Sequence, residues 1–485
     1  MNSLSAIKNN FGIKETAVTL TAMSGAIIAV FYDMTYLIAV PAIIICSVGL
    51  LINIKFAFAA LMFLTPLSVT FKLGDSSLSI PDEPILILLA VTGIIHILIT
   101  PKKNFSFFSH PVSILLIVRI LWIFATSFTS SIPEVSFKYT ASQFWLMFAI
   151  YFVAEELFKG PQSIKLIHSH LAALMIVVLY TFSRQYYYGL HDLHVAGWVV
   201  QPFYNDHTAY GAILALFLPV CISMFFLPHK KTSYKILITA VTATISISIV
   251  YSYCRAAWIS IAGAAAIFAV LKLKIKPWIS VSAAFVIITF IMLNFKEVKN
   301  NFYFNKQESS NNISEHIKSV TNIKGDASNL ERLNRWHCAF KMFNKHPFIG
   351  FGAGTYMFEY GKYQSNNDKT IISTNFGTVG NCHSEYFSPL VETGIPGFVI
   401  WIAILFFTLR AAYKVYKFCV NKSLKLIVTG CAFGLITYYI HGILNNFLDT
   451  DKLSVPFWTF TMIIVSASFH CKNKNHGENI SNTID

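Results

Sequence analysis

The stretch HTAYGAILALFLPVCISMFFL, residues 207–227, contains no Asp, Glu, Lys or Arg. An apolar segment of this length is long enough to cross the hydrocarbon core of a bilayer. The whole chain has the same character, because 55% of its 485 residues are hydrophobic and only 12% are charged. The charged fraction is about half of that in an ordinary soluble domain. This composition excludes a soluble enzyme, a disordered chain and a small disulfide-stapled domain.

Apolar runs of this kind recur from one end of the chain to the other. They predict an all-α integral membrane protein with about 12–14 transmembrane helices and one large periplasmic loop. The predicted spans cover residues 16–32, 35–52, 56–71, 84–100, 111–128, 141–158, 165–182, 207–227, 235–253, 256–271, 278–294, 384–409, 426–444 and 454–470.

The same runs divide the chain into four regions. Residues 1–294 form an N-terminal transmembrane bundle of about 11 spans. Residues 295–383 form the large periplasmic loop, 384–470 the C-terminal spans, and 471–485 a cytoplasmic tail.

The net charge of +14 has two interpretations. In a soluble protein it would suggest nucleic acid as a partner. In a membrane protein, Lys and Arg concentrate in cytoplasmic loops. If the N-terminus is cytoplasmic, more than half of the 37 basic residues fall in cytoplasmic segments. We therefore predict that both termini are cytoplasmic, that 295–383 lies outside, and that no nucleic acid binds.

The outer loop carries an expected amphipathic helix near 329–345. Its apolar residues recur at helical spacing, which predicts a helix on the membrane surface or over the mouth of the bundle. These residues are Leu333, Trp336, Phe340 and Phe343. Arg332 and Arg335 lie beside this stripe. They either reach a phosphate group or only solvate the helix.

Two further arginines stand at the outer ends of predicted spans. Arg255 begins one span, and Arg184 precedes the aromatic cluster Tyr186–Tyr188. An arginine in this position either anchors the span at the interface or faces an anion, which its planar fork binds through two hydrogen bonds. The aromatic cluster is either an interfacial belt or a surface on which a sugar stacks.

Ionisable residues also enter the predicted span 384–409. His383, Glu385 and Glu392 fall in its outer half, where charged groups usually face a cavity. A histidine titrates near neutral pH and is a natural proton acceptor. The plainer interpretation of His383 is an interface histidine that bonds backbone. In a continuous helix, Glu385 and Glu392 would share a face.

The combination resembles the O-antigen ligase and O-antigen polymerase superfamily. The resemblance is carried by the order of several segments on a multi-span chain and is best over residues 200–400. These segments are SYCRAAW at 252–258, RLNRW at 332–336, PFIGFG at 347–352, HSEY at 383–386 and ETGIPG at 392–397. Asp206-His207 stands where many members have Pro-Asn, so the roles of these two residues stay open.

The resemblance implies a bacterial inner-membrane glycosyltransferase with a periplasmic active site. The donor would be a glycan on undecaprenyl pyrophosphate, and membrane lipids would surround the protein. It implies pyrophosphate contact by Arg255 and Arg335 first, then Arg184 and Arg332. The base would be His383, with Glu385 as its substitute. Such transferases are metal-independent and inverting, and no cofactor is expected.

The acceptor stays open at this point. It is lipid A core in a ligase, a second lipid-linked glycan in a polymerase, or a protein hydroxyl in an oligosaccharyltransferase; we favour the ligase. Outside the class, a flippase of lipid-linked glycans would carry charged residues through the full membrane depth, together with internal repeats.

Overall fold

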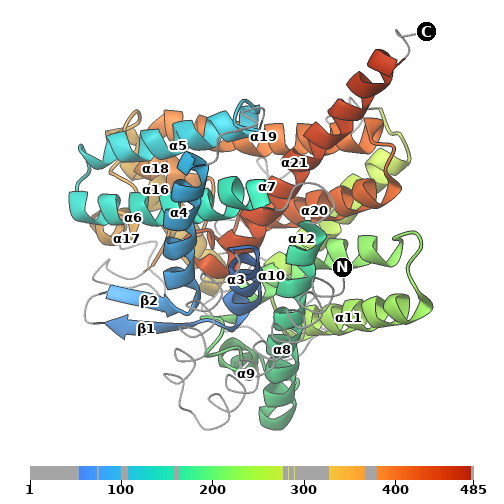
Figure 1. The fold of residues 1–485 in the computed structure, drawn as a ribbon. Coiled ribbons are helices and arrows are strands. Elements are labelled where there is room, and N and C mark those ends of the chain that lie inside the picture. The colour runs from blue at the N-terminus through green and yellow to red at the C-terminus, as the bar shows by residue number, and fades with distance from the viewer. Residues whose placement is uncertain are drawn as a thin grey trace.

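A computed structural model describes residues 54–73, 76–99, 107–157, 163–276, 327–365 and 380–481, together with the isolated residues 282 and 289. The predicted spans 16–32 and 35–52, and nearly all of 278–294, lie outside the described residues. Within the described part, seven helices are long and apolar enough to cross a membrane. The chain is therefore an all-α integral membrane protein, as the sequence predicts (Figure 1).

The described helices fall into two halves of the chain. The first half contains α3 (Ile54–Leu64), α4 (Asp82–Ile99), α5 (Pro111–Ser127), α6 (Pro133–Met147), α7 (Ala154–Leu157), α8 (Ile164–Tyr188) and α9 (Leu193–Trp198), with a π-helical segment, Phe148–Val153, joining α6 to α7. The second half contains α10 (His207–Phe225), α11 (Thr232–Tyr251), α12 (Arg255–Lys272), α16 (Ala327–Lys345), α17 (Tyr356–Glu359), α18 (Phe387–Glu392), α19 (Gly394–Phe418), α20 (Lys422–His441) and α21 (Asp451–Ser481).

The stretch 207–227 forms the central helix of the bundle. Helix α10 is apolar on every side, which is typical of a helix that is surrounded by others. It packs against α11, α12, α20 and α21, and Leu214 and Phe217 are fully buried. By contrast, Ile236 and Leu237 on α11 are 65% and 59% exposed. In a membrane these side chains of α11 would face lipid.

The predicted span 56–71 is wrong. Helix α3 ends at Leu64, a 3₁₀ turn follows over Thr65–Leu67, and the chain then enters a β-hairpin. Its strands β1 (Val69–Leu73) and β2 (Ser76–Ile80) are antiparallel, with Val69 opposite Ile80. The proline at the start of the 3₁₀ turn cannot donate to the preceding helical turn, which ends α3.

The predicted span 384–409 is not one continuous helix. The break falls at Thr393, between α18 and α19, and Gly394 has φ +71°. The loop after α16 packs backbone against backbone at this break. A Cβ on Gly394 would lie 2.2 Å from the carbonyl oxygen of Phe348, and one on Gly350 would lie 2.3 Å from the carbonyl carbon of Glu392. Glycine is required at both positions, because no side chain fits between the two backbones.

The face of α16 that is buried differs from the one expected. The residues buried in the structure are Glu331, Asn334, Arg335, Cys338, Ala339 and Met342. Phe340 of the predicted apolar stripe is 46% exposed, and its ring meets that of Phe387 on α18 edge-on. The polar face is buried because α16 lies against the turn that precedes α18, where its charges find partners.

The C-terminal helix α21 is longer than the predicted span 454–470. It continues without a break to Ser481 and leaves the bundle at its C-terminal end (Figure 1). Part of the expected tail, 471–485, is therefore helical.

Candidate active site

Arg255 and Arg332 come together from helices that are far apart in the sequence. Arg255 is the first residue of α12, after a tight turn in which Tyr253 has φ +53°. It is close enough to Arg332 of α16 for the two guanidinium charges to repel each other. Arg332 donates from Nε to the carbonyl oxygen of Leu444, at 3.0 Å, and from Nη2 to Asn445 Oδ1, at 3.5 Å. The turn after α20 therefore holds the Arg332 guanidinium in place.

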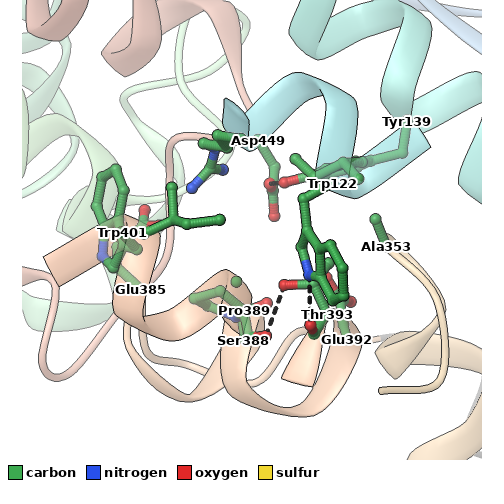
Figure 2. Close-up of a pocket in the computed structure, with 14 residues that line it drawn as sticks. Trp122, Tyr139, Ala353, Glu385, Ser388, Pro389, Glu392, Thr393, Trp401 and Asp449 are labelled. Carbon is green, nitrogen blue, oxygen red and sulfur yellow. Dashed lines mark hydrogen bonds between the residues drawn. The ribbon is translucent and has the colours of Figure 1, made fainter. Parts of the chain in front are cut away.

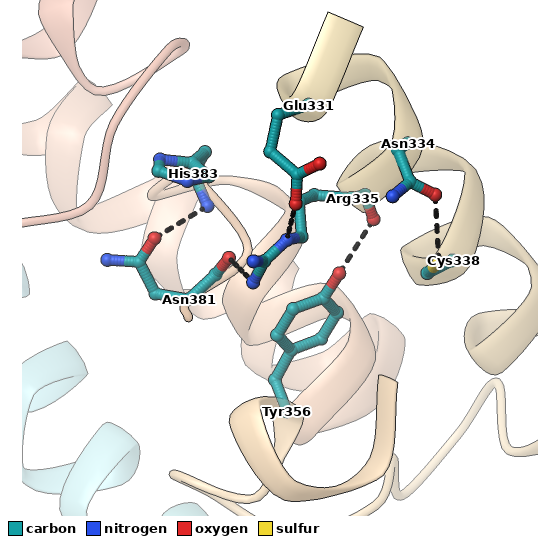
Figure 3. A network of polar contacts seen from close by, with 7 residues as sticks. All are labelled: Glu331, Asn334, Arg335, Cys338, Tyr356, Asn381 and His383. Atoms are coloured by element: carbon teal, nitrogen blue, oxygen red, sulfur yellow. Dashed lines mark hydrogen bonds and ion pairs between the residues drawn. The ribbon is translucent and has the colours of Figure 1, made fainter. Parts of the chain in front are cut away.

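Arg335, one helical turn further along α16, is held by a buried ion pair. Its Nε lies 2.6 Å from Glu331 Oε1, and its Nη1 donates to the carbonyl oxygen of Asn381 at 3.3 Å. Its guanidinium also lies 4.1 Å from the centre of the Tyr360 ring. Figure 3 shows the guanidinium directed at the loop that carries Asn381 and His383. The ion pair with Glu331 leaves Arg335 with a largely compensated charge.

His383 lies before α18 and not within a helix. It has φ +52°, and its backbone N–H donates to Asn381 Oδ1 at 3.2 Å (Figure 3). Burial, followed by the charges of Arg332 and Arg335, lowers the pKa of His383 from 6.5 to about 4. The imidazole is therefore neutral near pH 7 and lies within electrostatic reach of both arginines.

A comparison with known families identifies the part of the chain that carries these residues. Residues 240–402 match the model of the O-antigen ligase family, Wzy_C. The chain carries a domain of the O-antigen ligase superfamily. Among curated proteins, none matches the chain. The domain indicates a glycan transferase of the ligase or polymerase type in a multi-pass bacterial membrane protein. It contains Arg255, Arg332, Arg335 and His383.

Two residues outside the matched domain, Asp206 and His441, also lie within electrostatic reach of Arg332. Asp206 caps α10, where its Oδ1 accepts hydrogen bonds from the backbone N–H of Thr208 and of Ala209 at 2.7 and 3.0 Å. Its charge acts on Arg332 and on His383. The imidazole of His441, the last residue of α20, lies 3.1 Å from Asn445 Nδ2 and within electrostatic reach of Arg332. From the sequence, the role of Asp206 stays open because Asp206-His207 departs from the Pro-Asn of many family members, and His441 carries no motif that singles it out.

Arg184 makes its contacts with a different part of the chain. Its Nη1 donates to the phenol oxygen of Tyr180 at 3.0 Å and to the carbonyl oxygens of Val199, at 3.1 Å, and Gln201. The guanidinium also lies 5.1 Å from the centre of the Trp198 ring. These contacts fasten the C-terminal end of α8 to the loop after α9, which is a structural role.

Glu385 lines a small cavity and supports the turn after α20. Its Oε1 accepts from Tyr438 Oη at 2.6 Å and from the backbone N–H of Phe447 and of Leu448, both at 2.9 Å. Glu392 and Asp449 line the same cavity, which at about 30 Å³ has room for one or two waters (Figure 2). Burial, followed by the charge of Asp449, raises the pKa of Glu385 to about 7. The described hydrogen bonds of Glu385 thus hold the turn after α20, and its predicted role as substitute base stays a prediction.

Cys338 and Cys382 are buried in this region as free thiols. They pack in one small hydrophobic core with Met342, Tyr356 and Tyr360, and this core supports α16.

Arg335→Ala is expected to destabilise the protein as well as to lower activity. The substitution leaves the buried Glu331 carboxylate without its cation, which costs ~3–5 kcal/mol of unfolding free energy. The melting temperature of the detergent-solubilised protein measures this effect. The double variant Glu331→Gln/Arg335→Met should recover most of the stability and little of the activity. A single variant as stable as the wild type would contradict this interpretation of the ion pair.

Proposed function

We propose that the protein transfers a glycan from an undecaprenyl-pyrophosphate donor to an acceptor hydroxyl at the periplasmic face of the inner membrane. The observation that carries this proposal is the convergence of Arg332 and Arg335 on a neutral His383, with Arg255 beside Arg332. A leaving pyrophosphate needs fixed cations, and an acceptor hydroxyl needs a proton acceptor.

The proposed step is a single displacement. The acceptor oxygen attacks the anomeric carbon of the donor, and the bond from that carbon to the phosphate oxygen breaks. The pyrophosphate leaves with the bonding electrons, and the hydroxyl proton passes to an imidazole nitrogen of His383. Attack from the face opposite the leaving group inverts the anomeric centre.

Arg255 and Arg332 are assigned to the pyrophosphate, and Arg335 supports them from the side of His383. Two guanidiniums that repel each other without a ligand gain most when a dianion enters between them. Arginine remains charged throughout the reaction, so these residues can stabilise the leaving group without a metal ion.

The pH dependence of the reaction should reveal how the donor affects His383. Since the pKa of His383 is lowered to about 4, the imidazole of the free enzyme becomes protonated only below that pH. A bound pyrophosphate neutralises the nearby arginines and favours the imidazolium, so the pKa rises by ~1 unit or more. We expect kcat/KM for the donor to fall near pH 4, and kcat/KM for the acceptor at saturating donor to fall at higher pH. If both kcat/KM values fell at the same acidic pH, bound donor would not raise the pKa of His383, and this prediction would be contradicted.

The acceptor that we favour is lipid A core, as in a ligase, and a deletion strain tests this choice. Loss of all capped lipopolysaccharide, with accumulation of lipid-linked polymer, is the result expected of a ligase. Lipopolysaccharide capped with single repeats would instead assign a polymerase. Unchanged lipopolysaccharide with lost glycoprotein bands would assign a protein oligosaccharyltransferase.

A further inference from the structure

A second cavity of about 330 Å³ adjoins the arginine cluster, on the other side of Asn381. Its lining comes from five separate segments: the hairpin β1–β2, the first turn of α4, the loop before α10 with the start of α10, Asn381, and the connection from α20 into α21. The lining residues are Thr70, Ser79, Glu83, Phe203, Tyr204, Asn205, Asp206, Ala209, Asn381, Asn446, Phe447, Asp449, Thr450, Asp451 and Lys452.

Asn381 connects this cavity to the reacting groups. Its Oδ1 accepts from the backbone N–H of His383, and its carbonyl oxygen accepts from Arg335. Its Nδ2 donates to the carbonyl oxygen of Asn446 at 3.4 Å. A ligand in the cavity would therefore contact Asn381, which is itself hydrogen-bonded to the backbone of His383.

The cavity is acidic, unlike the arginine cluster. Carboxyl groups reach it from three segments, at Glu83, Asp206, Asp449 and Asp451. Lys452 is the one cation among its described lining residues. The ammonium of Lys452 is already hydrogen-bonded within the protein: it donates to the carbonyl oxygens of Pro66, at 3.0 Å, and of Ser68.

The remaining lining suits a polyhydroxylated ligand. Asn446 is only 4% exposed, and within the described part of the chain its Oδ1 has no hydrogen-bond partner. A buried amide oxygen without a partner is costly, and a ligand hydroxyl would satisfy it. The aromatic rings of Phe203 and Tyr204 offer apolar contact area beside the polar groups.

We infer that this cavity binds the acceptor's receiving sugar and selects a sugar that is uncharged or amine-bearing and carries no phosphate. The inference rests on the proposed function. Because like charges repel across a site, the carboxylates exclude a phosphorylated sugar, and they also keep the donor pyrophosphate on the arginine side of Asn381. The two substrates are thus sorted by charge.

The test uses the full-length protein in nanodiscs with the lipid-linked glycan of its own host as donor. Three synthetic glycolipid acceptors differ only at the terminal sugar, which is neutral, 6-phosphorylated or 2-amino. We expect kcat/KM for the phosphorylated acceptor to be at least ~10-fold below that for the neutral one. The amino acceptor should equal or exceed the neutral one.

Charge variants show whether the cavity causes this preference. Glu83→Lys should reduce the ratio of kcat/KM for the neutral acceptor to kcat/KM for the phosphorylated acceptor by ~10-fold. Because Glu83 Oε2 accepts from the backbone N–H of Ser79, at 2.8 Å, Glu83→Gln preserves the hairpin and should narrow the ratio less. Asp449→Asn tests the same kcat/KM ratio independently, because Asp449 lies in the connection from α20 to α21. Glu134→Lys, on an exposed part of α6 outside the cavity, should leave the ratio unchanged.

The outcomes separate this inference from the proposed function. Equal use of the phosphorylated acceptor, or a ratio that neither Glu83→Lys nor Asp449→Asn moves, overturns the inference and leaves the transferase intact. Transfer to none of the three acceptors by the wild type overturns both. Arg255→Lys should slow transfer to all acceptors by the same factor, because it acts on the donor.

Discussion

His383→Ala is expected to lower the rate of glycan transfer by ~10²–10⁴-fold, the contribution typical of a positioned general base. The imidazole is neutral and lies beside both Arg332 and Arg335, so in our proposal it accepts the proton where the pyrophosphate leaves. The measurement is the transfer rate in membrane vesicles that contain equal amounts of inserted protein.

His194→Ala is the matched control for this variant. His194 is exposed on α9 and lies outside the cluster, so its loss should leave transfer unchanged. If His383→Ala kept more than about a tenth of the wild-type rate, a loss below that expected of a general base, His383 would not be the base.

Arg255→Ala is expected to reduce transfer by ~10²–10³-fold, the loss typical of removing one group that stabilises developing charge. Arg255→Lys should also be poor, because a point charge replaces the two-pronged fork that matches a phosphate. Donor binding and transfer are measured together, since the leaving-group charge grows only as the bond breaks. The rate should therefore fall more than donor affinity does.

The control for Arg255 is Arg410→Ala, which removes an exposed arginine near the C-terminal end of α19. It should leave the transfer rate unchanged. Equal losses in the two variants would mean that Arg255 acts through the general charge of the protein and not on the donor.

The long helices are the part of the fold that the sequence predicts well. A run without charged residues such as 207–227 has one stable arrangement in a bilayer, because every backbone group must be bonded within the helix. This argument does not extend to the hairpin β1–β2. Only its first residues, 69–71, continue the apolar run of α3, from which the turn at Thr65–Leu67 separates them. Hydropathy alone cannot tell a strand at the membrane surface from the end of a span.

The candidate site shows a similar division. Motif order pointed to Arg255, Arg332, Arg335 and His383, and the structure brings these four residues together. It does not bring Arg184 to them, because position at a helix end does not reveal which carbonyl oxygens lie within reach. Tertiary contacts of this kind depend on packing between distant segments, which one sequence does not display.

The buried polar face of α16 could not be predicted for the same reason. An apolar stripe normally marks the buried side of a helix. Here Glu331 and Arg335 are buried as a pair, and burial of charges is tolerated because each compensates the other. Periodicity cannot identify such a face, since the partners Asn381 and Tyr360 come from other segments.

The most direct test of the central claim is reconstitution of the purified protein with an undecaprenyl-pyrophosphate-linked glycan and lipid A core, in the presence of EDTA. We expect one released undecaprenyl pyrophosphate for each glycosylated acceptor, and a transfer rate lowered by ~10²–10⁴-fold in His383→Ala. Movement of the lipid-linked glycan across the membrane with no bond broken would contradict the account and assign the protein as a transporter.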